Sequence, residues 1–215
     1  MAGRAAIVVA AGASTRFNGD KMMIEVAGLP LVAHSVRSLQ KHVGVCVLVC
    51  REDQQDRLSD LDLGAELVIG GATRTESELS GLAAVGGMPD VVGIHDGARP
   101  LVTSELIEEL YQAAASTGGA VPVLDPELPL VKRTNLEPAG AMVVQTPQVF
   151  RTAPLLSSFV KAAKDGFNGH DTADVVSRYS KAEIAAVPGD PTNIKVTYPE
   201  DLERVRGLLE DRSRT

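Results

Sequence analysis

Short apolar runs alternate with amphipathic stretches along most of the chain. The apolar runs are continuous, which is typical of strands that helices cover on both faces. The predicted strands are Ala5–Ala10, Gly44–Cys50, Ala65–Ile69, Val91–Ile94, Ala120–Val123 and Ala182–Val187. The predicted helices are Pro30–Lys41, Asp53–Leu61, Glu76–Val85, Ser104–Ser116 and Ala153–Lys164, with a short one after Thr172 and a terminal one from Pro199. This order predicts an α/β fold with a doubly wound, mostly parallel sheet.

The alternation lapses between residues 125 and 144. The stretch DPELPLVKRTNLEPAGAMVV has three prolines and no helical period, so it predicts an extended excursion from the sheet, a short β-arm. A chain of 215 residues otherwise fits a single domain, residues 1–215. One further short strand is expected at Ile194–Val196.

The first predicted strand runs into a loop of small residues followed by two cations. The small residues are Ala10, Ala11, Gly12, Ala13 and Ser14, and the cations are Arg16 and Lys21. Small side chains let backbone N–H groups approach a ligand at the carboxyl end of a strand, and nearby cations suit a polyphosphate. The loop has neither the GxGxxG of dinucleotide-binding folds nor the GxxxxGK[ST] of P-loop proteins. We therefore predict a nucleotide-binding loop of another type, carrying its own catalytic charges.

A second loop follows the strand that ends at Ile69. Gly70 and Gly71 are followed by Arg74, and the double glycine with this cation favours a binding role over a plain turn. Thr75 and Glu78 have the spacing of a capping box, which predicts that a helix starts here.

A third loop, HDGARP, follows the strand Val91–Ile94. Asp96 and Arg99 form a charged pair beside small residues, at the edge of the sheet where α/β enzymes place their chemistry. The alternative is that Asp96 caps a turn and Arg99 is solvated. His95 alone is interpreted as a structural histidine. Lys195 is costly to bury unpaired, so it either faces solvent at a sheet edge or reaches an anion in the cleft.

The amino-acid composition limits the classes of molecule that the protein could bind. The net charge of −7 and the aromatic content of 3% disfavour nucleic acid, which needs a basic face or stacking platforms. No apolar run approaches the roughly 18 residues of a membrane span, and the first residues do not resemble a signal peptide. We therefore expect a cytoplasmic protein with no membrane partner. Cys46 and Cys50 share one face of a strand and are interpreted as buried structural thiols.

The order of the motifs resembles one family. AAG with Arg16 and Lys21, then GGxxR, HDGARP, QTPQ, NIKVT and PEDL are similar to the 2-C-methyl-D-erythritol 4-phosphate cytidylyltransferases, over essentially the whole chain. The resemblance implies a nucleotidyltransferase fold of Rossmann type and transfer of a cytidylyl group from CTP to 2-C-methyl-D-erythritol 4-phosphate. The products would be pyrophosphate and 4-diphosphocytidyl-2-C-methyl-D-erythritol, an isoprenoid precursor. The resemblance also implies Mg²⁺ and a homodimer formed through the 125–144 arm.

The same resemblance implies roles for individual residues. Arg16 and Lys21 would be the catalytic pair that stabilises charge at the reacting phosphate. The nucleotide would be bound by Ala10, Ala11, Gly12, Ala13, Ser14, Gly70, Gly71, Ser77 and Lys195. The acceptor would be bound by Asp96, Arg99, Thr146, Lys161 and His170. Asp96 would also be the metal ligand.

The chain departs from the family pattern at several positions, so it resembles a divergent member. Ser14 replaces a second glycine, Asp20 stands where a proline usually precedes the lysine, and the segment from Arg16 to Lys21 is shorter. Ala72 replaces an aspartate, and His170 opens a run that is usually Thr-Asp-Asp-Ala. Most of these changes affect the acceptor side. Two alternatives therefore stay open: ribitol 5-phosphate or another polyol or sugar phosphate as acceptor, and an inactive nucleotide-binding or dimerisation module.

Overall fold

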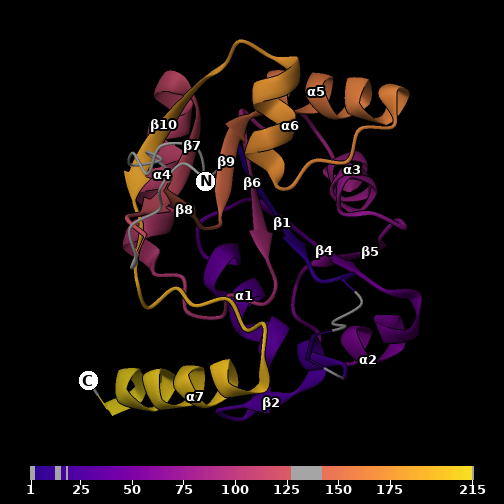
Figure 1. Ribbon diagram of the computed structural model, residues 1–215. Helices are drawn as coiled ribbons and strands as arrows, with labels where there is room; N and C mark the ends of the chain where they lie inside the picture. The colour runs from indigo at the N-terminus through magenta and orange to yellow at the C-terminus, as the bar shows by residue number, and fades with distance from the viewer. Residues whose placement is uncertain (1–2, 13–15, 18, 127–141, 215) are drawn as a thin grey trace, which may run out of the picture.

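The computed structural model describes residues 3–12, 16–17, 19–126 and 142–214, and it has the predicted α/β architecture (Figure 1). The main sheet consists of β1 (Arg4–Val9), β4 (Val45–Cys50), β5 (Glu66–Ile69), β6 (Val91–Asp96), β7 (Gly118–Leu124), β8 (Val143–Val144), β9 (Gln148–Arg151) and β10 (Glu183–Pro188). Their order is β10-β7-β9-β6-β1-β4-β5, with β8 paired to β7. Every strand predicted between Ala5 and Val187 is present, with small shifts at its ends.

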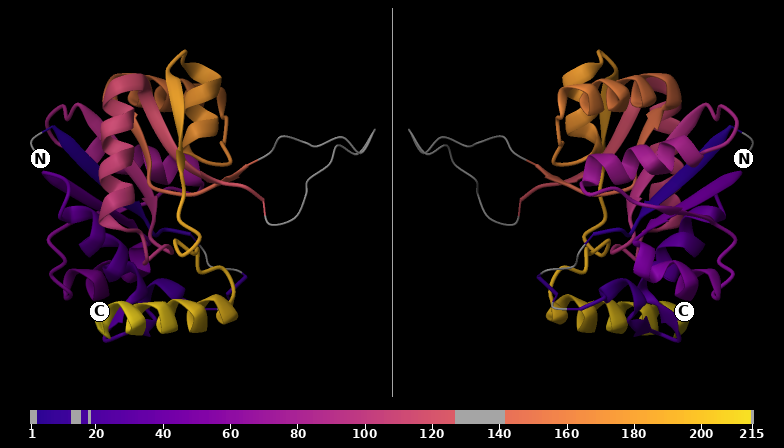
Figure 2. Two further views of the ribbon diagram at one scale, coloured as in Figure 1. Left: turned by 90° about the vertical axis from the view of Figure 1, so that its left-hand side faces the viewer. Right: turned by 90° about the vertical axis from the view of Figure 1, so that its right-hand side faces the viewer.

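Helices cover both faces of the sheet, as the continuous apolar strands predict. One face carries α1 (Leu31–Gln40) and α4 (Ser104–Thr117), and the other carries α3 (Arg74–Ala84), α5 (Thr152–Asp165) and α6 (Thr172–Tyr179). A 3-10 turn, η2 (Glu52–Gln54), leads from β4 into the short helix α2 (Gln55–Ser59). The last helix, α7 (Pro199–Arg214), lies apart from the sheet (Figure 2).

Two apolar layers hold these helices on the sheet. Every residue of β6 is buried, and each large aliphatic side chain fully buried in this way contributes roughly 1.5–3 kcal/mol. Cys46 and Cys50 both lie in the layer under α1 and α4 and form no disulfide. Burial raises the pKa of the Cys46 thiol to about 12. Their interpretation as buried structural thiols is confirmed.

One strand of the sheet was not predicted. β9 lies between β6 and β7 and is antiparallel to both. Its four residues, QVFR, are too few to give a pattern, and both of its partners are distant in the sequence. Its position matters for the site, because it brings Thr146 and Gln148 to the carboxyl end of β6.

A third apolar cluster joins α7 to the beginning of the chain. A small hairpin, β2 (Glu25–Val26) with β3 (Leu29–Pro30), packs with α7 through Val26, Val196 and Val205. Phe17, from the first loop, belongs to the same cluster. The last part of the chain therefore packs beside the loop that the sequence marks as functional.

Two local predictions are wrong. Residues 193–197 form an irregular segment instead of the expected strand at Ile194–Val196, and Val196 N donates to Ala98 O. The cap of α3 is Thr73, whose Oγ1 accepts from Glu76 N, and Glu76 completes the capping box. The predicted box residues, Thr75 and Glu78, lie inside the helix and are buried.

The β-arm is described only at its base. There β8 pairs antiparallel with the end of β7, Val144 opposite Val123. Residues 127–141 lie outside the described residues, so the protruding arm and the single-domain organisation stay predictions. Among the helices that the structure describes, none combines the length and the apolar character needed to cross a bilayer.

Candidate active site

A cavity of about 390 Å³ opens at the carboxyl ends of β1 and β6, where the sequence predicts the site. It is lined by Val9, Ala11, Gly12, Arg16, Phe17, Lys21, Met22, Gly71, Ala72, Thr73, Arg74, Ser77, Asp96, Ala98, Lys195 and Thr197. Four of these side chains are cationic and one is a carboxylate. The volume suits a small-molecule ligand, and the surplus of positive charge favours a polyanion.

Lys21 opens a short 3-10 turn, η1 (Lys21–Met23), and its side chain lies in the cavity wall. The residue is only 9% exposed, and Nζ donates a 2.8 Å hydrogen bond to Val196 O. Burial, together with the positive charges of Lys195 and Arg16, lowers the pKa of Lys21. A cation in such surroundings gains stability when an anion arrives, so the position suits a phosphate group.

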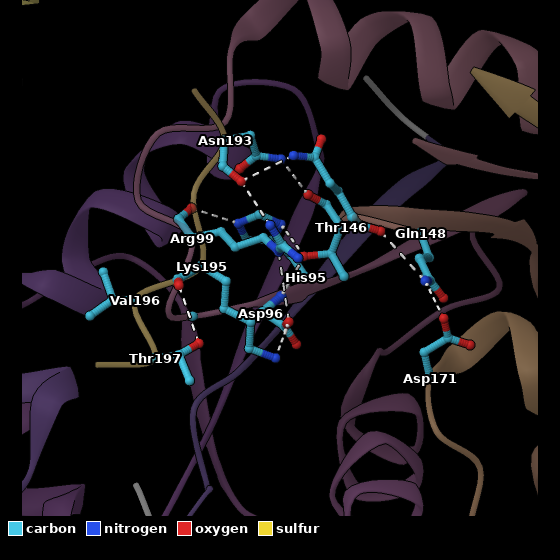
Figure 3. A network of polar contacts seen from close by, with 12 residues as sticks. His95, Asp96, Arg99, Thr146, Gln148, Asp171, Asn193, Lys195, Val196 and Thr197 are labelled. Carbon is cyan, nitrogen blue, oxygen red and sulfur yellow. Dashed lines mark hydrogen bonds and ion pairs between the residues drawn. The ribbon is translucent and has the colours of Figure 1, made fainter. Parts of the chain in front are cut away.

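Asp96, the last residue of β6, is the centre of a cluster of ion pairs (Figure 3). Its Oδ1 lies 2.9 Å from Arg74 Nη1, and its Oδ2 lies 2.7 Å from Lys195 Nζ and 3.8 Å from Arg99 Nε. Burial by itself would raise the pKa of Asp96, but the charges of Arg74 and Lys195 outweigh it and hold the pKa well below its usual range. The ionised carboxylate thus orients cations from three separate segments.

Asp96 is held from behind by the segment that leads into β9. Asp96 N donates to Thr146 Oγ1 at 3.0 Å, and the same hydroxyl lies 3.1 Å from His95 Nδ1. The other ring nitrogen of His95, Nε2, lies 3.0 Å from Arg99 O. Burial lowers the pKa of His95 to about 4, so the ring is neutral. Its interpretation as a structural histidine is confirmed, and Thr146 faces this network instead of the cavity.

The irregular segment at residues 193–197 completes the wall (Figure 3). Asn193 Nδ2 donates to Thr146 O at 2.9 Å, and Arg99 Nη1 donates to Asn193 O at 2.7 Å. These bonds hold the segment that contains Lys195 at the carboxyl ends of the strands, where the Lys195 ammonium pairs with Asp96. Of the two interpretations of Lys195, the one that brings its head into the cleft is supported.

The double glycine allows two loops to meet at the cavity. A Cβ on Gly70 would lie 2.5 Å from Ala11 Cβ and 2.8 Å from Ser77 Oγ. Both distances are shorter than van der Waals contact, so any larger residue at position 70 would clash. Gly71 N donates to Ser77 Oγ at 3.1 Å. Gly71 and Ser77 line the cavity, whereas Gly70 provides the close approach.

Glu78 is a carboxylate of the site that sequence reasoning missed. It is 1% exposed, its Oε1 lies 2.7 Å from Arg74 Nε, and its Oε2 accepts from Thr172 Oγ1 at 3.1 Å. Burial raises the pKa of Glu78 to about 7, although the charge of Arg74 opposes the rise. Arg74 is therefore held between two carboxylates. The i,i+4 spacing of Arg74 and Glu78 could have indicated this pair.

Asp96 does not fit the predicted role of metal ligand. Mg²⁺ needs oxygen ligands that are free to coordinate it, whereas each oxygen of Asp96 lies within 2.9 Å of a cationic nitrogen. In the described part of the chain, no group of three or more His, Cys, Asp or Glu side chains is placed to hold a metal. A magnesium ion at this site would have to bring ligands of its own.

Several predicted site residues do not line the cavity. The backbone N–H of Ala10 is already bonded to Val49 O. Lys161 lies on α5 and donates to Tyr179 O, and His170 N is bonded to Asp174 Oδ2. Neither of these two residues lines the cavity. Arg99, Thr146 and Gly70 support it from behind, and Ala13 and Ser14 lie outside the described residues.

Comparison with known proteins places this site in a family. A family model for 2-C-methyl-D-erythritol 4-phosphate cytidylyltransferase matches residues 4–211. The chain is 32% identical to the enzyme of that name from Bacillus licheniformis, over 97% of this chain and 96% of the relative. It is 34% identical to the enzyme of that name from Dictyoglomus thermophilum, over 94% and 95%. The crystal structure of the enzyme of that name from Thermus thermophilus has a TM-score of 0.81 at 28% identity, covering 95% of this chain and 98% of that one.

These matches identify the fold as that of an α/β nucleotidyltransferase, and the mostly parallel sheet and the cationic cavity are compatible with that class. With a family match over nearly its whole length, the chain belongs to the 2-C-methyl-D-erythritol 4-phosphate cytidylyltransferase family, as its motif order implied.

Proposed function

We propose that the protein transfers the cytidylyl group of CTP to 2-C-methyl-D-erythritol 4-phosphate. An acceptor phosphate oxygen bonds to the α-phosphorus of CTP, and the bond from that phosphorus to the bridging oxygen of the β-phosphate breaks. The products are 4-diphosphocytidyl-2-C-methyl-D-erythritol, an isoprenoid precursor, and pyrophosphate. The observation that carries the proposal is the ring of four cations, Arg16, Lys21, Arg74 and Lys195, around the cavity of a chain from this family.

The reaction needs stabilised charge more than it needs a base. The acceptor phosphate is already an anion, so no strong base has to activate it. The difficulty is to bring anionic groups together while charge builds on the α-phosphoryl oxygens and on the leaving group. Cations fixed in place before the reaction reduce that barrier by positioning and by electrostatic stabilisation. We assign Lys21 and Arg16 to this task.

Lys21 and Lys195 differ in how they can serve a phosphate. Lys21 bonds to a neutral carbonyl, Val196 O, so the approaching triphosphate meets an ammonium whose described hydrogen-bond partner carries no formal charge. Lys195 is paired with Asp96 at 2.7 Å, so it has to share its charge between that carboxylate and a phosphate. We infer that Lys21 contributes most to the developing charge, and that Lys195 contributes mainly to binding.

We further propose that Mg²⁺ enters as the counter-ion of the triphosphate, held by phosphate oxygens. Support comes from the occupied oxygens of Asp96 and from the habit of Mg²⁺ of using substrate phosphates with few carboxylates. Calorimetry on the ligand-free protein is expected to detect no tight Mg²⁺ binding, while turnover follows the concentration of the Mg²⁺–CTP complex. Tight binding of Mg²⁺ to the free protein contradicts this proposal.

A single assay tests the reaction and both alternatives. The purified protein is incubated with Mg²⁺, each of the common nucleoside triphosphates, and a panel of polyol and sugar phosphates, and pyrophosphate is measured. The expected result is release with CTP and 2-C-methyl-D-erythritol 4-phosphate. Release with ribitol 5-phosphate instead would transfer the assignment to that acceptor. No release with any pair would indicate an inactive nucleotide-binding module.

We also propose a homodimer formed through the 125–144 arm. Met142, Val143 and Val144, at the described base of the arm, are apolar and 47%, 46% and 37% exposed. An exposed apolar strand next to a sheet is a surface that a second chain can cover. Light scattering is expected to give twice the chain mass of 22.6 kDa, and replacing both valines by lysine is expected to give monomers. A monomeric parent protein contradicts the proposal.

We place the protein in the cytoplasm, where CTP is available. The free, buried thiols of Cys46 and Cys50 are compatible with a reducing compartment. Fractionation of cells that express the full chain is expected to recover it in the cytoplasmic fraction, and recovery in another compartment would contradict this.

A further inference from the structure

The first loop is attached at Gly12 and at Asp20 to residues 50–57, which we name the β4 corner. This segment runs from the last residue of β4 into the beginning of α2. At the amino end of the loop, Gly12 O accepts a 3.4 Å hydrogen bond from Arg51 Nη1. At the carboxyl end, Asp20 Oδ2 lies 3.7 Å from Arg51 Nη2. One side chain of the β4 corner therefore spans both ends of the loop. Lys21 is the residue immediately after the second attachment.

Gln54 fixes the position of the second attachment, the one at Asp20. Its side chain is fully buried, and both groups of its amide are used. Nε2 donates to Asp20 Oδ1 at 2.7 Å, and Oε1 accepts from Arg51 N at 3.1 Å. Arg57 Nη1 adds a contact of 3.4 Å to the other oxygen of Asp20. Moving Asp20 would leave a buried donor without its partner, which costs about 1–3 kcal/mol, so the carboxylate is held in one place.

This attachment lies next to the catalytic lysine, not in the cavity. Gln54 and Arg51 do not line the cavity, and neither does Asp20. Figure 1 shows α2, whose first residues belong to the β4 corner, beside the indigo residues that precede β2. Lys21 has to cross from this anchored backbone into the cavity wall to reach Val196 O. The point from which its side chain starts is therefore set by contacts outside the cavity.

We propose that Asp20 and Gln54 are positioning residues that fix where Lys21 enters the active site, with Arg51 setting the span of the loop. The inference rests on the proposed function, in which Lys21 stabilises charge at the α-phosphate. A displacement of about 1 Å of a catalytic group can cost about 10²-fold in rate. The β4 corner thus acts on the reaction through Lys21 without touching either substrate.

Three variants and one matched control test the kinetic consequence. Asp20→Ala removes every contact of the carboxylate, Asp20→Asn keeps an oxygen for Gln54 but loses the charge, and Gln54→Leu removes the amide. We expect kcat for pyrophosphate release to fall about 10²-fold in Asp20→Ala and Gln54→Leu, and less in Asp20→Asn, while KM for CTP changes little. The control is Asp53→Ala, because Asp53 also pairs with Arg51, at 2.8 Å, but makes no described contact with Gly12 or Asp20. Its kcat is expected to match the parent.

A second readout follows the position of Lys21 without catalysis. The pKa of Lys21 is measured by NMR after isotopic dimethylation of the lysines, and its signal is the one lost in Lys21→Arg. In the parent this pKa is lowered by burial and by Lys195 and Arg16, while Asp96 and Asp201 act in the opposite direction. Removing a nearby negative charge would by itself lower the pKa further. Release of the ammonium into water would instead raise the pKa toward 10.5, so the sign identifies movement.

The proposal expects the pKa of Lys21 to rise and kcat to fall together in Asp20→Ala and Gln54→Leu. An unchanged or lowered pKa in both variants overturns it, whatever happens to kcat, because Lys21 has then not moved. Equal losses of kcat in Asp53→Ala also overturn it. If the parent protein releases no pyrophosphate, the proposed function fails, and the pKa measurement still decides whether the β4 corner positions Lys21.

Discussion

The two sides of the cavity are built in different ways. On one side, Asp96 gathers Arg74 and Lys195 into ion pairs of 2.9 and 2.7 Å, with each residue supplied by a different segment. On the other side, Arg16 and Lys21 come from one loop, and Lys21 bonds to a neutral carbonyl. Charges that are already paired in the absence of substrate hold the segments of the site in fixed positions. Charges without such pairing are available to act on the substrate.

This contrast makes a prediction about mutations. Changes in the paired cluster are expected to cost mainly stability, because they leave buried charges without partners. Changes at Lys21 are expected to cost mainly turnover, because its described hydrogen-bond partner, Val196 O, carries no formal charge and no buried charge is left unpaired. Four substitutions, taken from the largest expected effect to the smallest, test that division.

Asp96→Ala is expected to lower the free energy of unfolding by about 3–5 kcal/mol at pH 7, the usual cost of removing one partner of a buried pair. The pKa of Asp96 is lowered in the folded state, so its stabilisation is present above the unfolded pKa of about 4 and is lost as the pH falls through the folded value. Urea denaturation measures both. Glu203→Ala, which removes the exposed pair with Arg206, is the control and should change stability by less than about 0.5 kcal/mol. A stable but inactive Asp96→Ala would break the contrast.

Lys21→Ala is expected to reduce kcat by about 10²–10³-fold, the usual effect of losing one preorganised charge at a reacting centre. The thermal unfolding temperature should stay the same or rise, because a buried cation with a lowered pKa is removed. Pyrophosphate release and a thermal scan on the same sample provide both values. Normal turnover would remove Lys21 from the catalytic pair.

Glu78→Gln tests the paired side of the cavity through the pH dependence of stability. The pKa of Glu78 is raised to about 7 by burial, so its contribution to stability is fully present below the unfolded pKa, near 4.5, and is lost as the pH rises through 7. The neutral glutamine does not titrate. The stability of the parent relative to the variant should therefore fall by about 3 kcal/mol between pH 4.5 and pH 8, because the folded pKa of about 7 lies above the unfolded value of 4.5 and each pKa unit corresponds to about 1.4 kcal/mol. Denaturation curves that keep a constant difference across this range would contradict the prediction.

Tyr198→Ala should have the smallest effect. The guanidinium of Arg16 lies 5.9 Å from the centre of the Tyr198 ring, and an exposed cation–π contact contributes about 0.5–1 kcal/mol. We expect KM for CTP to rise by no more than about five-fold with little change in kcat. A large fall in kcat would show that Arg16 depends on the ring for its catalytic position.

Much of the fold could be predicted because its strands are local signals. β1, β4 and β6 are mostly apolar runs, and a run of this kind can be predicted as a strand from its own residues alone. β9 could not be predicted, since four residues carry no period and its pairing with β6 and β7 is decided by tertiary structure. The strand expected at Ile194–Val196 is absent, again because tertiary contacts decide the local structure. Its apolar residues pack in the cluster around α7, and Val196 N donates to Ala98 O instead of to a strand.

The site was predictable where loops follow strands and less so where helices intervene. Lys21, Asp96 and Lys195 meet at one cavity because strand ends share an edge of the sheet. Lys161 and His170 were assigned from the family resemblance alone, and neither lines the cavity. Glu78 was missed as a residue of the site because its spacing from Thr75 suggested a capping box, although its i,i+4 spacing from Arg74 is also that of an ion pair.

The crossing of residues 193–197 over the strand ends has a consequence for how the enzyme is made. Synthesis supplies Lys21 long before Val196, yet the two are bonded in the folded protein. The strands up to β10 are therefore synthesised before the residues that complete the site. A nascent chain halted before Asn193 would have Lys21 but not the wall that residues 193–197 supply, so competence for the reaction would begin only after these residues have been added.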